Sequence, residues 1–362
     1  MQKLQGRRLQ SDRVSLNEVQ KVQAVSAIQN VVGYELLRLE RYHQRSHEST
    51  NPAEKDNPMR IILMGQAAFA EKSLEKIISK GEEVVAVYCP PDPPSGKPDP
   101  VKQKAISLGI PVRQHKSFKA PELREEFVAL NADLAILAFV SQIVPEHVFG
   151  APRLGSICFH PSLLPKYRGA SAINWALIKG ETVTGLTLFW VDRGIDTGPI
   201  LLQKEVAVDP DDTTGSLYFN KIFPLGIEAI GAAVDLIKIG NPPRIIQDES
   251  TASYDPPCQD EHAKIDWSKP ATEVYNLIRG CDPQPGAHTR YRGKQLRIFD
   301  ARLQRDATGS LPGQVTRIGT DEITIALNGG ALTVKRVRGA GAKVSAAEFA
   351  KEARIEVGAQ LG

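Results

Sequence analysis

Residues 60–65 have the sequence Arg-Ile-Ile-Leu-Met-Gly, a short apolar run stopped by a glycine. A run of this kind is typical of a buried β-strand. A helical pattern follows over residues 69–80, and a second strand pattern follows over residues 84–88. Because strand and helix patterns alternate from here onward, we predict an α/β domain with a Rossmann-like parallel sheet that is covered by helices on both faces.

The pattern continues through the next hundred residues. Ligands of such sheets bind beyond the carboxyl ends of the strands, so Gly65, the turn at residues 140–142 and the segment after Phe159 are expected to surround one cleft. The turn after Gly65 lacks the Gly-x-Gly-x-x-Gly sequence of a usual dinucleotide site. Further strands are predicted at residues 134–139, 156–160, 186–191 and 200–208, and helices at residues 122–130, 171–179 and about 213–239.

The chain is predicted to contain two domains and two flanking segments. After a proline-rich linker at residues 241–257, short strands separated by glycine and polar turns indicate a small OB-like β-barrel. Near the N-terminus, apolar residues recur every three or four positions between residues 16 and 42, which predicts a helix that could contact a protein partner. The predicted parts are a helical extension and linker (1–58), the α/β domain (59–257), the OB-like domain (258–345) and a tail (346–362).

Composition excludes several classes of protein. The chain has 362 residues, of which 41% are hydrophobic and 24% charged, as in ordinary globular proteins. A net charge of +3 is too small to imply nucleic acid or an anionic membrane by itself. No apolar run is long enough to span a bilayer, and the polar N-terminus does not resemble a secretory signal. Four cysteines without a Cys-x-x-Cys spacing argue against a zinc site and against a disulfide framework, so we predict a protein of the reducing cytoplasm without a metal.

The candidate chemistry lies in two short segments. His160 follows a buried strand and precedes Pro161 and Pro165, so a stiff loop holds its imidazole over the predicted cleft. Asp196 lies in the second segment, where glycines permit a tight turn. A carboxylate beside an imidazole can orient it and exchange protons with it. The spacing alone fits equally well a turn in which the aspartates only cap backbone amides.

The first segment resembles a known signature. Residues 160–169, His-Pro-Ser-Leu-Leu-Pro-Lys-Tyr-Arg-Gly, are similar to the SLLP signature of the 10-formyltetrahydrofolate-dependent formyltransferase family. Asp196 lies 36 residues after His160 (196 − 160), which matches the separation of histidine and aspartate in that family. The resemblance covers roughly residues 59–337. It implies an enzyme that uses 10-formyltetrahydrofolate as co-substrate, releases tetrahydrofolate and needs no metal.

The formyl acceptor remains open among three classes. Residues 139–142 and 169–175 are similar to the N-terminal hydrolase domain of 10-formyltetrahydrofolate dehydrogenase, which favours water. Methionyl-tRNA formyltransferases carry a more basic insertion after the second strand, whereas residues 90–100 contain Lys97 as their one basic residue. A small-molecule amine is the third alternative. Since the sequence ends at Gly362 without an aldehyde-dehydrogenase domain, NADP-linked oxidation of the formyl group is not expected.

The resemblance also assigns roles to residues. It implies that His160 polarises the formyl oxygen, and that Asp196 orients His160 and takes a proton from the attacking water or amine. Arg168 is expected either to meet a substrate charge or to pair with a nearby carboxylate. The residues expected to hold the folate or form the wall beside its formyl group are Phe139, Val140, Ser141, Gln142, Ile143, Ser162, Leu163, Leu164, Pro165, Arg168, Ile195 and Gly198.

Cys158 departs from the family pattern. The transferases have an asparagine at this position, two residues before the histidine, where it helps to hold the oxyanion of the tetrahedral intermediate. A thiol is a weaker hydrogen-bond donor than an amide, and the loss of one oxyanion donor commonly lowers the rate by about 100- to 1,000-fold. Cys158 is therefore a packing residue, a weak donor or a transient formyl acceptor. A folate-binding regulator without turnover is a further alternative, although pure binding needs neither His160 nor Asp196.

Overall fold

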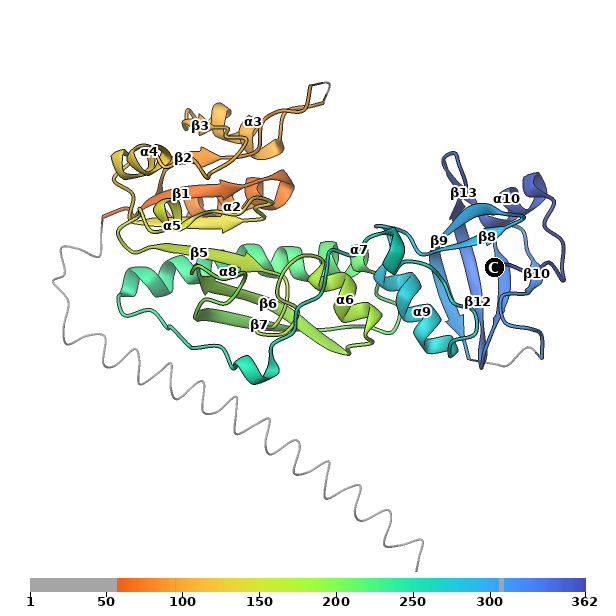
Figure 1. Cartoon of the computed structure of the whole chain (residues 1–362). Coiled ribbons are helices and arrows are strands. Elements are labelled where there is room, and N and C mark those ends of the chain that lie inside the picture. Colours follow the sequence, from red (N-terminus) through yellow and green to blue (C-terminus); the bar gives the residue numbers. More distant parts are fainter. Residues whose placement is uncertain (1–56, 95, 306–308) are drawn as a thin grey trace, which may run out of the picture. The chain divides into compact units, whose positions relative to one another are not determined.

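A computed structural model describes residues 57–94, 96–305 and 309–362 (Figure 1). The helix predicted between residues 16 and 42, with its possible protein contact, lies outside these ranges. The first sheet has the order β3-β2-β1-β4-β5-β6-β7. Its strands are β1 (Arg60–Gly65), β2 (Glu83–Tyr88), β3 (Val112–Arg113), β4 (Leu134–Ala138), β5 (Ser156–His160), β6 (Val183–Trp190) and β7 (Ile200–Ala207).

The parallel sheet is confirmed for the first five strands. β1 pairs in parallel with β2 and β4, and β2 pairs in the same way with β3, as does β4 with β5. The last two strands differ, because β6 runs antiparallel to both β5 and β7. An antiparallel edge on an otherwise parallel sheet is common in large α/β domains. The carboxyl ends of β1, β4 and β5 therefore meet at one edge of the sheet.

Helices cover both faces of the sheet, as predicted. Successive residues of a strand point to opposite faces, and β1 follows this rule: Ile61 and Leu63 belong to one hydrophobic core, while Ile62 and Met64 belong to another. The first core is completed by α2 (Ala67–Ser79), α3 (Pro100–Ser107) and α8 (Phe223–Ile239), and the second by α4 (Leu123–Ala129) and α5 (Glu146–Phe149). Within the described ranges, no helix is long and apolar enough to cross a membrane.

The helix predicted from about Thr213 to Ile239 forms in three pieces. Thr213 caps α7 (Thr214–Leu217) through a capping box with Ser216. A π-helical turn follows over Tyr218–Ile222, and α8 then begins at Phe223 with Pro224 in its first turn. Proline has no backbone N–H and cannot donate the regular helical hydrogen bond, so the wider turn lies where the α-helical ladder cannot continue unchanged.

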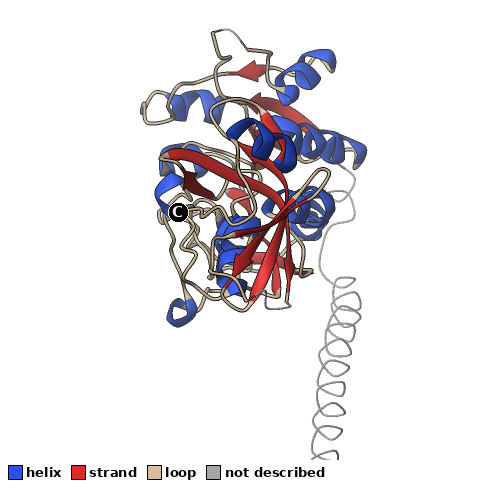
Figure 2. Cartoon of the chain, turned by 90° about the vertical axis from the view of Figure 1, so that its right-hand side faces the viewer, coloured by secondary structure: helices blue, strands red, loops and turns tan. Residues whose placement is uncertain are grey.

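The second domain is an antiparallel, OB-like half-barrel. Its sheet has the order β10-β11-β12-β9-β8, with β13 paired to β12. Figure 2 shows these strands beside the helices that pack on them. The elements are α9 (Ala271–Gly280), β8 (His288–Tyr291), β9 (Lys294–Gln304), β10 (Val315–Ile318), β11 (Ile323–Leu327), β12 (Gly330–Arg338), β13 (Lys343–Ser345) and α10 (Ala346–Ala353).

The boundary of the second domain differs from the prediction. Residues 346–362 were expected to be a tail, but Ala346 and Ala350 of α10 and the later Ile355 and Leu361 are buried in the core of this domain. The helix forms because Ser345 caps it by accepting from the N–H of Glu348. Its small residues alternate with charged ones, and that pattern is too weakly apolar to distinguish a packed helix from an exposed segment.

The proline-rich segment at residues 241–257 is more than a linker. The backbone of Ile245 exchanges two hydrogen bonds with Ile200 at the start of β7. Farther along, the backbone N–H of Arg168 donates to the carbonyl of Ser253 at 2.9 Å. We call residues 245–254 the strap, because they connect β7 with the loop that follows β5. The strap therefore lies against both segments that carry the candidate chemistry.

The amino end of α2 is occupied by a side chain of the protein. Both carboxylate oxygens of Asp99 accept from the backbone N–H of Ala67, at 3.0 and 2.9 Å. Asp99 also caps α3 by accepting from the N–H of Val101. A helix amino end attracts anions because its N–H groups lack partners. Here the carboxylate of Asp99 fills the place that a phosphate takes in many α/β proteins.

We expect Asp99→Ala to lower the free energy of unfolding by about 1–2 kcal/mol, since loss of a helix cap commonly costs that much. The first turns of α2 and α3 both lose the carboxylate as a hydrogen-bond acceptor, so the loss of stability is expected to lie toward the upper end of this range. Urea denaturation followed by circular dichroism measures it. Asp321→Ala, in an exposed turn between β10 and β11, is the control and is expected to change stability by less than about 0.5 kcal/mol. Equal stability of the two variants would contradict the capping role.

Candidate active site

The candidate site lies at the carboxyl ends of the neighbouring strands β1, β4 and β5. Gly65 of β1 pairs with Ala138 of β4, and Leu137 of β4 pairs with Cys158 of β5. By this register, Phe139 and His160 stand at the same level at the carboxyl ends of neighbouring strands. The prediction of a cleft at this edge required that the three strands be adjacent, and the sheet order places them so.

His160 is held between a carbonyl and a carboxylate. The residue is 6% exposed, and its Nε2 lies 2.7 Å from the carbonyl oxygen of Tyr167. A carbonyl only accepts, so Nε2 carries the proton. The other ring nitrogen, Nδ1, lies 3.4 Å from Oδ2 of Asp196. Nδ1 is therefore the nitrogen that can exchange a proton with Asp196.

Asp196 is fixed by its own backbone and by neighbouring loops. Its φ of 56° lies in the left-handed region, which a non-glycine residue adopts at a cost and which is concentrated at functional sites. The N–H of Gly169 donates to Oδ2 at 2.7 Å, and the side-chain amide of Gln247 donates to the carbonyls of Asp196 and Gly198. The Asp196 side chain remains 18% exposed, so it is not sealed from solvent.

The guanidinium of Arg168 is buried and is hydrogen-bonded within the protein. The residue is 1% exposed, and its guanidinium donates to both carboxylate oxygens of Glu249, to Oε1 of Gln247 and to the hydroxyl of Tyr254. All three partners belong to the strap. Of the two expectations for Arg168, pairing with a carboxylate is the one that the geometry supports. Arg168 thus fixes the strap that in turn fixes Asp196.

Cys158 lies on the same face of β5 as His160. The Sγ atom is 3.6 Å from the carbonyl oxygen of Phe159. Burial raises the pKa of the Cys158 thiol well above its ordinary range, and the nearby charge of Asp196 raises it further. The thiolate is the nucleophilic form of cysteine. The environment therefore favours the packing and weak-donor hypotheses over that of a transient formyl acceptor.

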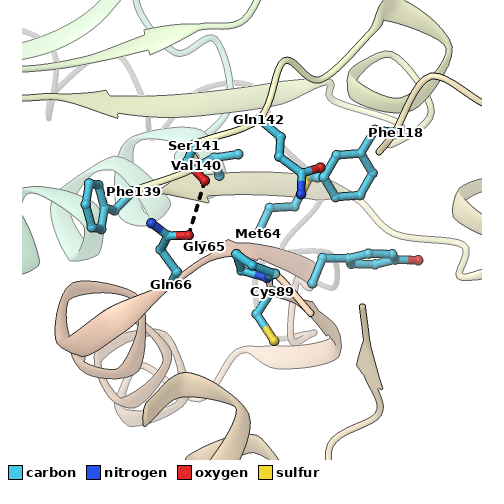
Figure 3. A pocket seen from close by; sticks show the side chains of 11 residues that line it. Met64, Gly65, Gln66, Cys89, Phe118, Phe139, Val140, Ser141 and Gln142 are labelled. Carbon is cyan, nitrogen blue, oxygen red and sulfur yellow. Dashed lines mark hydrogen bonds between the residues drawn. The ribbon is translucent and has the colours of Figure 1, made fainter. Parts of the chain in front are cut away.

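A pocket lies on the β1 side of the same edge (Figure 3). It is a shallow depression with a cavity volume of about 10 Å³. The buried Oε1 of Gln142 has no hydrogen-bond partner within the part of the chain that the structure describes. The residues that line the pocket are Met64, Gly65, Gln66, Tyr88, Cys89, Pro90, Phe118, Phe139, Val140, Ser141 and Gln142.

Three large apolar side chains are exposed on the loops after β4 and β6. Phe139 is 50% exposed, Ile143 73% and Ile195 60%. We call these three residues the apolar rim. Phe139 also has a left-handed backbone, with a φ of 64°. Exposed apolar groups near a polar pair are typical of a binding surface for an aromatic or apolar ligand.

The other predicted site residues form the scaffold of the loop after β5. Ser162 is fully buried and donates to the carbonyl of Lys166. The N–H of the buried Leu164 donates to Thr187 of β6. Pro165 accepts from the N–H of Ser253 in the strap, and Leu163 packs beside Gly185. These contacts hold the loop in place and make it rigid around His160.

The family assignment follows from comparison with known proteins. The formyl transferase model matches residues 59–226, and the model of its C-terminal domain matches residues 257–354. Methionyl-tRNA formyltransferase of Geobacter metallireducens is 37% identical over 308 residues, which cover 83% of this chain and 98% of that protein. The chain belongs to the formyl transferase family.

Other relatives are longer than this chain. Cytosolic 10-formyltetrahydrofolate dehydrogenase of Xenopus laevis is 40% identical over 296 residues, but these cover 77% of this chain and only 32% of that protein. Among solved structures, HypX from Aquifex aeolicus in complex with tetrahydrofolic acid matches with a TM-score of 0.63 at 21% identity, over 83% of this chain and 48% of the other. At that identity the match confirms the fold. The described residues contain no group of three or more His, Cys, Asp or Glu side chains suited to a metal ion.

Several residues of the site were not predicted from sequence. Gln247 and Ser253 of the strap hold the two loops that carry His160 and Asp196, but they lie in a proline-rich stretch that has no periodic pattern. Tyr167 contributes its backbone carbonyl, which no side-chain pattern reveals. Gln66 also lines the pocket. Its position directly after the glycine that ends β1 is a sequence signal that could have identified it.

We expect Gly198→Ala to lower turnover by about 100-fold, because a misplacement of about 1 Å can cost that much. A Cβ at residue 198 would lie 1.7 Å from the carbonyl oxygen of Trp190, so the Asp196 loop must shift. Steady-state kinetics measures the loss. Gly341→Ala is the control, because a Cβ there meets nothing within 4 Å. Wild-type turnover in Gly198→Ala would show that the loop position is not critical.

We expect Cys158→Ala to keep turnover within about tenfold of the wild type, because a thiol is a weak donor and its raised pKa keeps it protonated. The raised pKa should also make this thiol react slowly with iodoacetamide at neutral pH, which mass spectrometry of the alkylated peptides measures. A loss as large as that of a His160 variant, together with a formylated cysteine during turnover, would support the acceptor hypothesis instead.

Proposed function

We propose that this chain takes the formyl group from 10-formyltetrahydrofolate and transfers it to water or to an amine, with tetrahydrofolate as the product. The observation that carries the proposal is the buried His160 beside Asp196 at the open edge of the sheet, with Nδ1 and Oδ2 3.4 Å apart. Simple folate binding does not require a coupled imidazole and carboxylate. Formyl transfer requires that a proton leave the nucleophile and that a negative charge be stabilised.

The pair divides this work between its members. Asp196 takes the proton from the attacking water or amine as the tetrahedral intermediate forms. His160 shares that proton through Nδ1, and its resulting positive charge stabilises the oxyanion. The proton then passes to the N10 nitrogen of the folate as the bond from that nitrogen to the formyl carbon breaks. Hydrolysis yields formate, and transfer yields a formamide.

The apolar rim and the pocket provide a place for the folate. The rings of a folate are flat and largely apolar on their faces, and the exposed Phe139, Ile143 and Ile195 offer contacts of that kind. In this proposal the loop after β4 binds the donor, as the sequence resemblance implies.

The negative charge of Asp99 at the β1–α2 turn affects which formyl acceptors can bind there. Asp99 already occupies the N–H of Ala67, and a carboxylate there repels a second anion. Among the pocket-lining residues there is no lysine or arginine. Both features disfavour a small acceptor that would place a phosphate at this turn, and they leave water or an amine without phosphate there.

Transfer to initiator methionyl-tRNA is the second candidate. It is supported by exposed basic side chains on the β8–β9 hairpin, Arg290, Arg292 and Lys294, which could neutralise phosphates. The relative named a methionyl-tRNA formyltransferase is matched over 98% of its length. The acidic residues among positions 90–100 count against it.

The deciding experiment incubates the protein with 10-formyltetrahydrofolate alone and follows tetrahydrofolate release. We expect release to fall by about 100- to 10,000-fold in His160→Ala and in Asp196→Asn, as is usual when a general acid–base group is lost. Asp235→Asn is the control, because Asp235 lies on α8 and pairs with Lys80 on the surface.

Each acceptor gives a distinct result. Release without any acceptor, lost in both variants, assigns hydrolysis. Release only with an added amine or with charged initiator tRNA assigns transfer and identifies the acceptor. Tight folate binding without turnover under all three conditions would contradict the enzymatic proposal.

A further inference from the structure

Two thiols lie side by side where the strap leads into the second domain. The Sγ atoms of Cys258 and Cys281 are 4.0 Å apart, and neither forms a disulfide. Cys258 follows the last proline of the segment at residues 241–257 and is partly exposed, whereas Cys281 is fully buried at the end of α9. A disulfide bond is about 2.05 Å long, so a shift of about 2 Å would join the two sulfurs.

The segments on either side of the pair are tied to one helix, α6 (Ala172–Ile178). The indole N–H of Trp175 donates to the carbonyl of Pro256 at 2.7 Å. The side-chain amide of Asn174 donates to the carbonyl of Gly280 at 2.7 Å. The N–H of Cys258 donates to the hydroxyl of Ser171 at 3.1 Å. Thus α6, which directly follows the His160 loop, bridges the two chain segments that carry the thiols.

The two sulfurs are chemically unequal. A hydrogen bond from Cys281 lowers the pKa of the Cys258 thiol, and the same contact together with burial raises that of Cys281. The other cysteines are poor nucleophiles, because burial raises the pKa of Cys89 to about 11 and that of Cys158 still further. A partly exposed thiol of lowered pKa beside a second thiol is the arrangement that oxidises most readily.

We propose that Cys258 and Cys281 form a reversible disulfide that fastens the end of the segment at residues 241–257 to α9. The oxidant is a low-molecular-weight disulfide such as glutathione disulfide. The thiolate of Cys258 attacks one of its sulfurs, and one glutathione thiolate leaves. Cys281 then gives its proton to that thiolate and attacks Sγ of Cys258, which releases the second glutathione. Two protein thiols are oxidised, and one glutathione disulfide is reduced to two glutathiones.

The bond adds a covalent link where hydrogen bonds to α6 now hold the two segments. A cross-link restricts the unfolded chain more than the folded one, so the oxidised protein is expected to unfold at a higher temperature. Because the pair lies outside the His160–Asp196 site, its chemistry is independent of the formyl acceptor.

The test treats the full chain with glutathione disulfide and counts free thiols after denaturation. Two of the four cysteines are expected to be lost, with a peptide that joins residues 258 and 281 in the mass spectrum and full recovery after dithiothreitol. The thermal midpoint should rise on oxidation and fall back on reduction. Retention of all four thiols, a cross-link elsewhere or an unchanged midpoint in the cross-linked protein would overturn the proposal.

Single variants separate the two roles. Cys281→Ser is expected to retain glutathione as a mixed disulfide on Cys258, since no second thiol can displace it. Cys258→Ser is expected to stay reduced, because Cys281 is buried. If Cys281→Ser does not fold, Cys281→Ala serves in its place. Cys89→Ser is the matched control and should oxidise as the wild type does; oxidation of Cys258→Ser to the same extent would contradict the mechanism.

Discussion

The bidentate contact between Arg168 and Glu249 organises the candidate site. Arg168 is buried, while the side chain of Glu249 is 68% exposed. The buried guanidinium is therefore the partner that determines the geometry of the ion pair. A planar guanidinium that donates hydrogen bonds on several sides both stabilises its partners and fixes their orientation. The same strap that Arg168 secures supplies Gln247, which donates to the carbonyl of Asp196. The contact therefore supports the aspartate loop indirectly, beside the direct hydrogen bond from the N–H of Gly169 to Asp196.

Two kinds of structure meet at His160. On one side, hydrogen bonds with Tyr167, Gly169 and the strap hold His160 and Asp196 in place. On the other, Phe139 and Ile195 leave apolar surface open to solvent. A rigidly held His160–Asp196 pair beside an exposed apolar surface suits a large aromatic co-substrate. Such a ligand can cover the apolar surface without moving the pair.

The sequence predicted well what depends on local pattern. β1, β4 and β5 are apolar runs, and their order along the chain was enough to expect His160 at a sheet edge; the fixed spacing of His160 and Asp196 then indicated the family. What it did not predict depends on contacts between distant segments. Gln247 lies 51 positions from Asp196 and shows no periodicity, and α10 is too polar to be distinguished from a tail. Arg168 was open to two roles because only the fold reveals its partner.

The His160–Asp196 pair and the charged groups that bear on the formyl acceptor lie in different parts of the fold. The His160–Asp196 pair and its supporting strap depend on β5, the loop after β6 and Arg168. The features that would select an acceptor lie elsewhere: Asp99 at the β1–α2 turn, and the basic side chains of the β8–β9 hairpin. A carboxylate at Ala67 disfavours an anion by Coulomb repulsion, and Asp99 does not contact the His160–Asp196 pair. In the proposed function, a substitution at Asp99 would therefore alter which acceptors fit without altering that pair.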